Sequence, residues 1–124
     1  MNSILKATCS QEWHNSGGYK LSAYMGTYNE DPNFLSLSNT PVWIGGAKKN
    51  IFIFKSRGGR WLITTKRQSI TEESGVLRTK IAYTESTSPP INAEWECWNS
   101  DYGVWLDNLW SEKGWVSMSG FSLY

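Results

Sequence analysis

Half of the eight tryptophans lie in one segment, "WECWNSDYGVWLDNLW" (95–110), where polar residues alternate with the indoles. A sugar ring presents apolar C–H faces and a rim of hydroxyls. An aromatic side chain can cover the faces, while amide and carboxylate groups bond the hydroxyls. The segment therefore contains both kinds of group that hold a carbohydrate.

The candidate ligand-binding residues combine stacking and hydrogen-bonding side chains. Asp101 can accept from two hydroxyls, Asn99 can donate and accept, and Gly103 lets the backbone come close. The alternative for each tryptophan here, as for Trp13 and Trp115, is packing in the core or at a strand edge. The predicted set is Trp98, Asn99, Asp101, Tyr102, Trp105, Asp107, Asn108 and Trp110.

The same aromatic surface also suits a protein partner, because Trp, Tyr and Arg dominate protein–protein hot spots. Arg57, Arg60 and Trp61 form a second patch of this kind. An exposed strand or aromatic patch could also join two copies into a homo-oligomer. The sequence favours a carbohydrate-binding, lectin-like module, with protein interaction or self-association as the alternative.

Signatures of catalysis and of cofactor binding are weak. The only histidine is His14, so no Ser–His–acid or Cys–His set is indicated. Two distant cysteines and one histidine do not match a closed zinc site, and "SRGGR" (56–60) lacks the lysine and helix of a P-loop. A glycosidase needs two carboxylates facing each other across a cleft, and candidate pairs are Glu94/Glu96, Asp101/Asp107 and Glu72/Glu73. We predict a non-enzymatic protein without cofactor or metal, and a hydrolase ranks third.

The charge balance and the length of the apolar runs limit the partners. Twelve basic residues against eleven acidic ones give a net charge of +1, with basic pairs only at Lys48-Lys49 and Lys66-Arg67. Capture of nucleic acid therefore has little support. No apolar run reaches the roughly 20 residues of a membrane span. The N-terminus lacks the apolar stretch of a signal peptide, which leaves an intracellular protein and a secreted mature form as alternatives.

Short β-rich runs separated by Gly, Pro, Asn and Ser clusters fill most of the chain. The clearest signal is a hairpin in which "IFIFK" (51–55) and "WLITTK" (61–66) flank Gly58-Gly59. In 103–110 a strand and a short helix both fit. Further strands are expected at 19–28, 41–44, 76–84, 94–98 and 114–124, and turns at 29–34, 45–50 and 86–92. The prediction is a single all-β domain over 1–124, an antiparallel sandwich or barrel-like fold of about seven or eight short strands.

Alternation along the strands predicts the core. The run "EWECW" (94–98) places Trp95 and Cys97 on one face and Trp98 on the other. We assign Trp95 to the core together with Trp43 and Trp61, because all three lie among apolar neighbours.

The two cysteines, Cys9 and Cys97, leave two alternatives open. A disulfide between them would restrict the unfolded chain by about 4 kcal/mol in the entropy model. Otherwise they are two buried free thiols. The compartment decides between these alternatives, and the sequence does not indicate it.

The order of short motifs in residues 26–98 resembles a small Tyr/Trp-rich β module of predicted proteins from marine invertebrates, algae and protists. The motifs are Gly26 with Tyr28, "NTPVW" (39–43), "IFIF" (51–54), "GRWLI" (59–63), "IAY" (81–83), Pro89-Pro90, and Trp95 or Trp98. The resemblance implies a small β fold and no catalytic residues. It covers about half of the chain. The N-terminal arm (1–18) and the Trp-rich C-terminal part (99–124) lie outside it, so it implies nothing about a site seated there.

Overall fold

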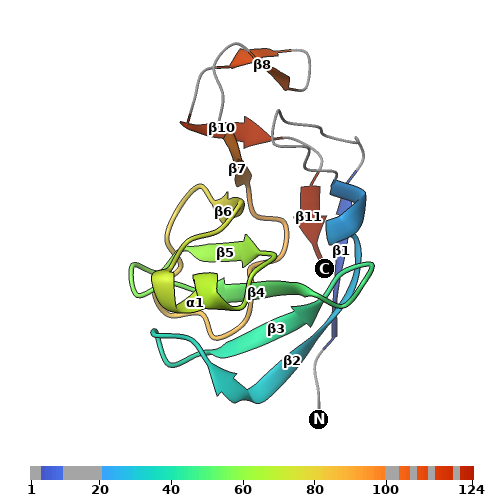
Figure 1. Ribbon diagram of the computed structural model, residues 1–124. Helices are drawn as coiled ribbons and strands as arrows, with labels where there is room; N and C mark the ends of the chain where they lie inside the picture. The colour runs from blue at the N-terminus through green and yellow to red at the C-terminus, as the bar shows by residue number, and fades with distance from the viewer. Residues whose placement is uncertain (1–3, 10–20, 100–103, 107–108, 112–113, 119–120) are drawn as a thin grey trace.

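The computed structural model describes residues 4–9, 21–99, 104–106, 109–111, 114–118 and 121–124 (Figure 1). For Cys9, Leu21, Ser22, Phe121 and the described residues from 99 to 118, it describes the backbone alone. The strands in this part are β1 (Ile4–Cys9), β2 (Gly26–Leu35), β3 (Pro41–Gly45), β4 (Ile51–Lys55), β5 (Trp61–Thr64), β6 (Leu77–Thr79), β7 (Trp95–Asn99), β8 (Val104–Leu106), β9 (Leu109–Ser111), β10 (Gly114–Met118) and β11 (Phe121–Leu123). A 3-10 turn, η1 (Leu21–Tyr24), and a short helix, α1 (Gln68–Glu72), complete the description.

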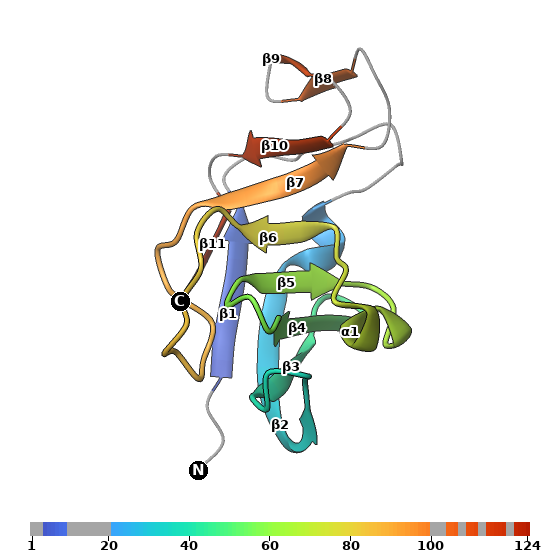
Figure 2. The same cartoon turned by 90° about the vertical axis from the view of Figure 1, so that its left-hand side faces the viewer.

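Nine of these strands form one antiparallel sheet in the order β10-β7-β6-β5-β4-β3-β2-β1-β11. The strands β10 and β11 lie at its opposite ends, yet only residues 119–120 separate them in the sequence. Three peptide steps span at most about 11 Å, so the sheet must curl until its two edges approach each other (Figures 1 and 2). The prediction of an all-β, antiparallel, barrel-like fold is confirmed.

The interior of the barrel is filled by large side chains from alternate strand positions. Trp43, Trp61 and Trp95 are 1%, 0% and 1% exposed, which confirms their assignment to the core. Burying each such side chain stabilises the fold by about 1.5–3 kcal/mol. Because Trp61 is buried, the prediction that it forms an exposed patch with Arg57 and Arg60 is wrong. One inward row crosses five strands through the register partners Trp43, Ile53, Ile63, Leu77 and Cys97.

A second apolar cluster lies on the outer face of the sheet. Ile70 of α1 is 1% exposed and packs there with Val42, Phe54 and Leu62. Both views show α1 against β4 and β5 (Figures 1 and 2). Sequence analysis missed this helix because five residues are too few for a helical period to emerge.

The connection between β6 and β7 is fastened to the β4–β5 hairpin by polar groups. The buried Lys55 ammonium donates to the carbonyls of Thr84 at 2.8 Å and Ser86 at 2.7 Å. The indole N–H of Trp61 donates to the Ser86 hydroxyl at 2.9 Å. These bonds satisfy a buried cation and a buried indole, which would otherwise be costly.

The prediction of a strand at 19–28 followed by a turn at 29–34 is wrong. Residues Leu21–Tyr24 form the 3-10 turn, and β2 runs through the expected turn as far as Leu35. Pro32 is tolerated because the pairing of β2 with β3 shifts between Asp31 and Leu35, so the ladder does not need its missing N–H. A hydrogen bond typical of turns is still present, because the Asp31 carboxylate accepts the backbone N–H of Asn33 at 3.0 Å.

Two other predicted strands have different bounds. The strand expected at 76–84 ends at Thr79, whose hydroxyl accepts the Trp61 backbone N–H at 3.2 Å and donates to the Ile81 carbonyl at 2.8 Å. These side-chain bonds take the place of backbone pairing on the β5 side, while on the β7 side the Lys80 N–H still donates to the Glu94 carbonyl at 3.0 Å. The strand expected at 114–124 is two strands, β10 and β11, which pair with β7 and β1.

Strands also occur near both ends of the chain, in β1 and in the β8–β9 pair. The predicted N-terminal arm contains β1, which the search for strand signals missed. The ambiguous segment 103–110 contains the strands β8 and β9, which pair with each other. Its described residues are therefore in strands, as the strand alternative predicted, but in two paired strands and not in one.

Gly45→Ala should destabilise the fold, because a Cβ at Gly45 would lie 2.0 Å from the Thr27 carbonyl oxygen and 2.7 Å from the Tyr28 Cα. Both atoms belong to the backbone of the paired strand β2. We expect urea denaturation to show a loss of about 1–3 kcal/mol in the free energy of unfolding. In the control Gly58→Ala, the new Cβ would meet only the Ser56 hydroxyl at 3.7 Å. Equal losses in the two variants would contradict the close approach of β2 and β3.

Candidate functional site

The outward-facing side chains of β5, β6 and β7 build the candidate site. Because Leu77 and Cys97 point into the barrel, Arg78, Glu96 and Trp98 must point outward. Trp98 is partly exposed, on the face opposite Trp95 as the alternation predicted. Its backbone N–H donates to the Val76 carbonyl at 2.8 Å, which fixes the base of the indole beside the start of β6.

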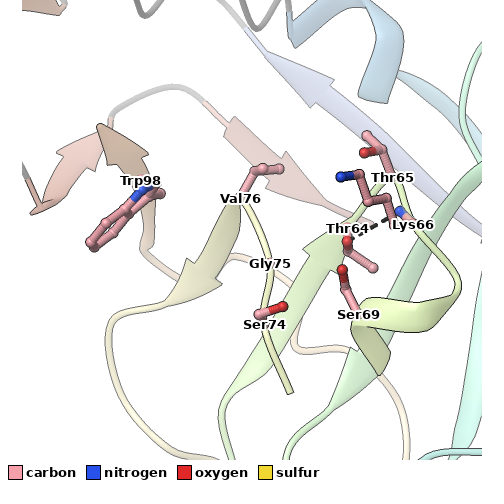
Figure 3. A pocket seen from close by; sticks show the side chains of 8 residues that line it. All are labelled: Thr64, Thr65, Lys66, Ser69, Ser74, Gly75, Val76 and Trp98. Atoms are coloured by element: carbon pink, nitrogen blue, oxygen red, sulfur yellow. Dashed lines mark hydrogen bonds between the residues drawn. The ribbon is translucent and has the colours of Figure 1, made fainter. Parts of the chain in front are cut away.

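Two adjoining hollows open on this face, and we call them together the Trp98 groove. The first has a volume of about 200 Å³ and is lined by Thr64, Thr65, Lys66, Ser69, Ser74, Gly75, Val76 and Trp98. The second, of about 400 Å³, is lined by Leu62, Glu73, Ser74, Gly75, Arg78 and Trp98. Figure 3 shows Trp98 on one side of the Gly75–Val76 segment, with Thr64, Ser69 and Lys66 on the other. The groove therefore has an aromatic end and a hydroxyl-rich end.

Hydrogen bonds of the backbone position the hydroxyl-rich end. After α1 the chain turns back through Glu73, which has a left-handed backbone (φ 53°). The Ser74 N–H then donates to the Ser69 carbonyl at 3.0 Å, and the Val76 N–H donates to the Ile63 carbonyl at 2.9 Å. Gly75 lies so close to β5 that a Cβ there would be 2.8 Å from the Ile63 oxygen. A side chain at position 75 would disturb the wall that both hollows share.

Two ion pairs border the groove. Arg78 Nε lies 2.9 Å from a Glu96 carboxylate oxygen across the β6–β7 pair. Arg57 holds Glu73 through its backbone N–H and through Nε at 2.7 Å. The backbone N–H of Arg57 lowers the pKa of the Glu73 carboxyl most, and the side chain of Arg57 adds to this, while burial opposes it. The Glu73–Arg57 pair fastens the end of α1 to the β4–β5 turn.

The structure describes the predicted site residues to different extents. Trp98 lines the groove. For Asn99 in β7, Trp105 in β8 and Trp110 in β9, only the backbone is described. Asp101, Tyr102, Asp107 and Asn108 lie outside the described residues. Among the described residues, the other side chains that line the groove with Trp98 are therefore outside the predicted set of binding residues.

Sequence analysis missed the hydroxyl-bearing side chains of the groove. The available signal was the density of Ser, Thr and Gly in "TTKRQSITEESG" (64–75). Such clusters usually mark loops, so composition alone did not separate this one from an ordinary connection. The pairing of β5 with β6 and of β6 with β7 brings the segment beside Trp98.

Three of the six carboxylates considered for hydrolysis have basic neighbours. Glu96 and Glu73 are in the ion pairs above, and Glu94 lies 3.8 Å from the Lys80 ammonium. Within the described residues, no group of three His, Cys, Asp or Glu side chains could hold a metal ion. In the same part of the chain, no helix is long and apolar enough to cross a membrane. Cys97 is 3% exposed; the side chain of Cys9 is not among those described, so the pairing of the two cysteines stays a prediction.

Comparison with protein-family models, with curated proteins and with solved structures found no match to this chain. The resemblance to the Tyr/Trp-rich module thus stays a prediction.

Glu73→Gln should make the stability less sensitive to acid. The folded protein lowers the pKa of the Glu73 carboxyl, so its ionised form favours folding above the unfolded pKa of about 4.3. This contribution is lost as the pH falls through the lowered folded value. Because Arg57 is 70% exposed, the contribution should be below about 1 kcal/mol.

Urea denaturation of both proteins from about pH 7 to about pH 3 measures this effect. The stability difference between wild type and Glu73→Gln should shrink at the acid end. The control Glu72→Gln removes the neighbouring exposed carboxylate and should keep the wild-type pH dependence. A Glu73→Gln profile parallel to that of the wild type would contradict the role of this ion pair.

Proposed function

We propose that the protein is a non-enzymatic, carbohydrate-binding module and that the Trp98 groove is its binding site. The observation that carries the proposal is a partly exposed indole on the wall of a hollow lined by hydroxyl groups. Trp98 offers an apolar plate for the C–H face of a sugar ring. The serine and threonine hydroxyls can donate to and accept from the hydroxyl rim of the ring.

The size and the construction of the groove suit a small ligand. Small-molecule sites usually enclose ~300–1,000 Å³, and the larger hollow measures about 400 Å³. One or two sugar rings fit this range. The aromatic wall and Arg78 stand on paired strands, and sites built on strands hold their geometry better than sites built on loops.

Protein contact is the alternative, and a different surface favours it. In the β6–β7 connection Ile81 and Ile91 are 60% and 58% exposed. A hollow of about 170 Å³ beside them is lined by Lys80, Ile81, Tyr83, Asn92, Ala93 and Glu94. Exposed apolar side chains of this kind are the usual material of an interface when they are contiguous.

Size-exclusion chromatography with light scattering distinguishes a monomeric sugar binder from a self-associating protein. We expect a mass near 14.1 kDa, that of one chain. A doubled mass that returns to the monomer value in the double variant Ile81→Ser/Ile91→Ser would favour self-association through the β6–β7 connection.

Trp98→Ala should weaken the binding of an oligosaccharide by about tenfold or more, because about 1.4 kcal/mol of lost stacking corresponds to a factor of ten. Trp98→Phe keeps an aromatic plate and should lose less. A glycan array with neutral and acidic sugars selects the ligand, and isothermal titration calorimetry measures the dissociation constants.

The control variant is Ile81→Ala, which shortens an exposed apolar side chain outside the groove and should keep the wild-type affinity. Thermal unfolding followed by circular dichroism shows whether each variant is folded. The proposal fails if the folded protein binds no sugar, or if Trp98→Ala binds as tightly as the wild type.

A further inference from the structure

The hollow beside Lys66 is rich in hydrogen-bond donors. Thr64 and Ser69 are only 3% and 9% exposed, although both line this hollow. Thr64 Oγ1 already accepts the backbone N–H of Lys66 at 3.2 Å, so the hydroxyl proton of Thr64 remains to be donated. The backbone N–H groups of Ser69 and Ser74 are bound to the carbonyls of Lys66 and Ser69, each at 3.0 Å. The hollow therefore presents to a ligand hydroxyl groups, which donate and accept, and one ammonium group, which only donates.

The charge of the groove is positive once its ion pairs are counted. Glu96 is neutralised by Arg78 at 2.9 Å, and Glu73 by Arg57 at 2.7 Å. No ion pair joins Lys66 to any other residue within the described ranges. The next residue, Arg67, lines neither hollow, and its guanidinium carbon lies 4.2 Å from the centre of the Phe34 ring. Lys66 is thus the charged group that the first hollow offers to a ligand.

We propose that the sugar bound in the Trp98 groove carries an anionic substituent, a carboxylate or a sulfate, and that Lys66 with the hydroxyls of Thr64, Ser69 and Ser74 binds it. This inference depends on the proposed carbohydrate binding and specifies the class of sugar. An ammonium group has three donors and no acceptor, while an ionised acidic group only accepts, so the two match. Hydrogen bonds to a charged acceptor are roughly twice as strong as neutral ones.

A neutral sugar suits this end of the groove less well. Each of its hydroxyls carries a proton that needs an acceptor. The serine and threonine hydroxyls can accept that proton, but a neutral sugar gives the Lys66 ammonium no charged acceptor and so forgoes the stronger charge-assisted bonds. Trp98, which Figure 3 shows at the other end of the groove, offers its indole to the face of the ring. The two ends together select for a ring with a charged substituent at its rim.

Isothermal titration calorimetry with matched sugars tests this inference. Trigalacturonate and its methyl ester share one skeleton and differ in charge; a sulfated galactose disaccharide and its desulfated form make the second pair. We expect the wild type to bind at least one acidic sugar about tenfold more tightly than its neutral match. The pair that shows this difference identifies the carboxylate or the sulfate as the recognised group.

Lys66→Gln should remove most of the difference in affinity between the acidic sugar and its neutral match, because the loss falls mainly on the acidic sugar. Lys66→Arg should retain most of the preference. Lys6→Gln is the matched control, because it removes the same charge from an exposed position on β1, four strands away from β5.

Two different results would overturn the inference. If a neutral sugar binds as tightly as its acidic match, and Trp98→Ala weakens both, the carbohydrate site stands and its selectivity for charge is wrong. If the folded protein binds none of these sugars, nor any sugar on the array, the proposed function itself fails.

Discussion

Only two residues join β10 to β11, although these strands lie at opposite ends of a nine-stranded sheet. This covalent constraint requires the sheet to close almost completely, and closure divides every strand into an inner and an outer face. The inside then has a fixed, small volume, and Trp43, Trp61 and Trp95 occupy much of it. Interiors are packed as densely as organic crystals, so a protein with eight tryptophans has little room left for more of them.

The outer face of the barrel is covered unevenly, and the groove is a consequence. Over β3, β4 and β5, α1 buries Ile70 against Val42, Phe54 and Leu62. Five residues of helix cannot extend over β6 and β7 as well. The chain after α1 therefore returns to the edge of β5 through Ser74 and Gly75, and leaves the hollows between this return and Trp98.

Local sequence signals predicted the parts of the fold that depend on neighbours along the chain. Alternation placed Trp95 and Cys97 inside and Trp98 outside, and the Gly58-Gly59 turn indicated the β4–β5 hairpin. The wrong predictions concern elements whose bounds depend on contacts with residues that are distant in the sequence. β10 and β11 are separate strands because they pair with β7 and β1 at opposite edges, and no local pattern contains that information.

The candidate site shows the same division between local and distant determinants. Its aromatic member, Trp98, was predicted from one short segment. Thr64 and Ser69 are more than 25 positions from Trp98 in the sequence. They line the same hollow only because the sheet register brings their segment close to β7.

The two arginine–glutamate pairs at the groove join segments of the fold and also determine the charge that a ligand meets. Each pair joins segments that are distant in the sequence, Arg57 with Glu73 and Arg78 with Glu96. The Arg57–Glu73 pair is exposed on its arginine side and contributes little to stability, whereas the Arg78–Glu96 pair is partly buried. Both pairs change the charge that a ligand meets. By holding both carboxylates, the arginines leave Lys66 as the charge that the first hollow presents. A chain with a net charge of only +1 can in this way present a locally cationic site, because selectivity depends on which charges are already paired and not on their sum.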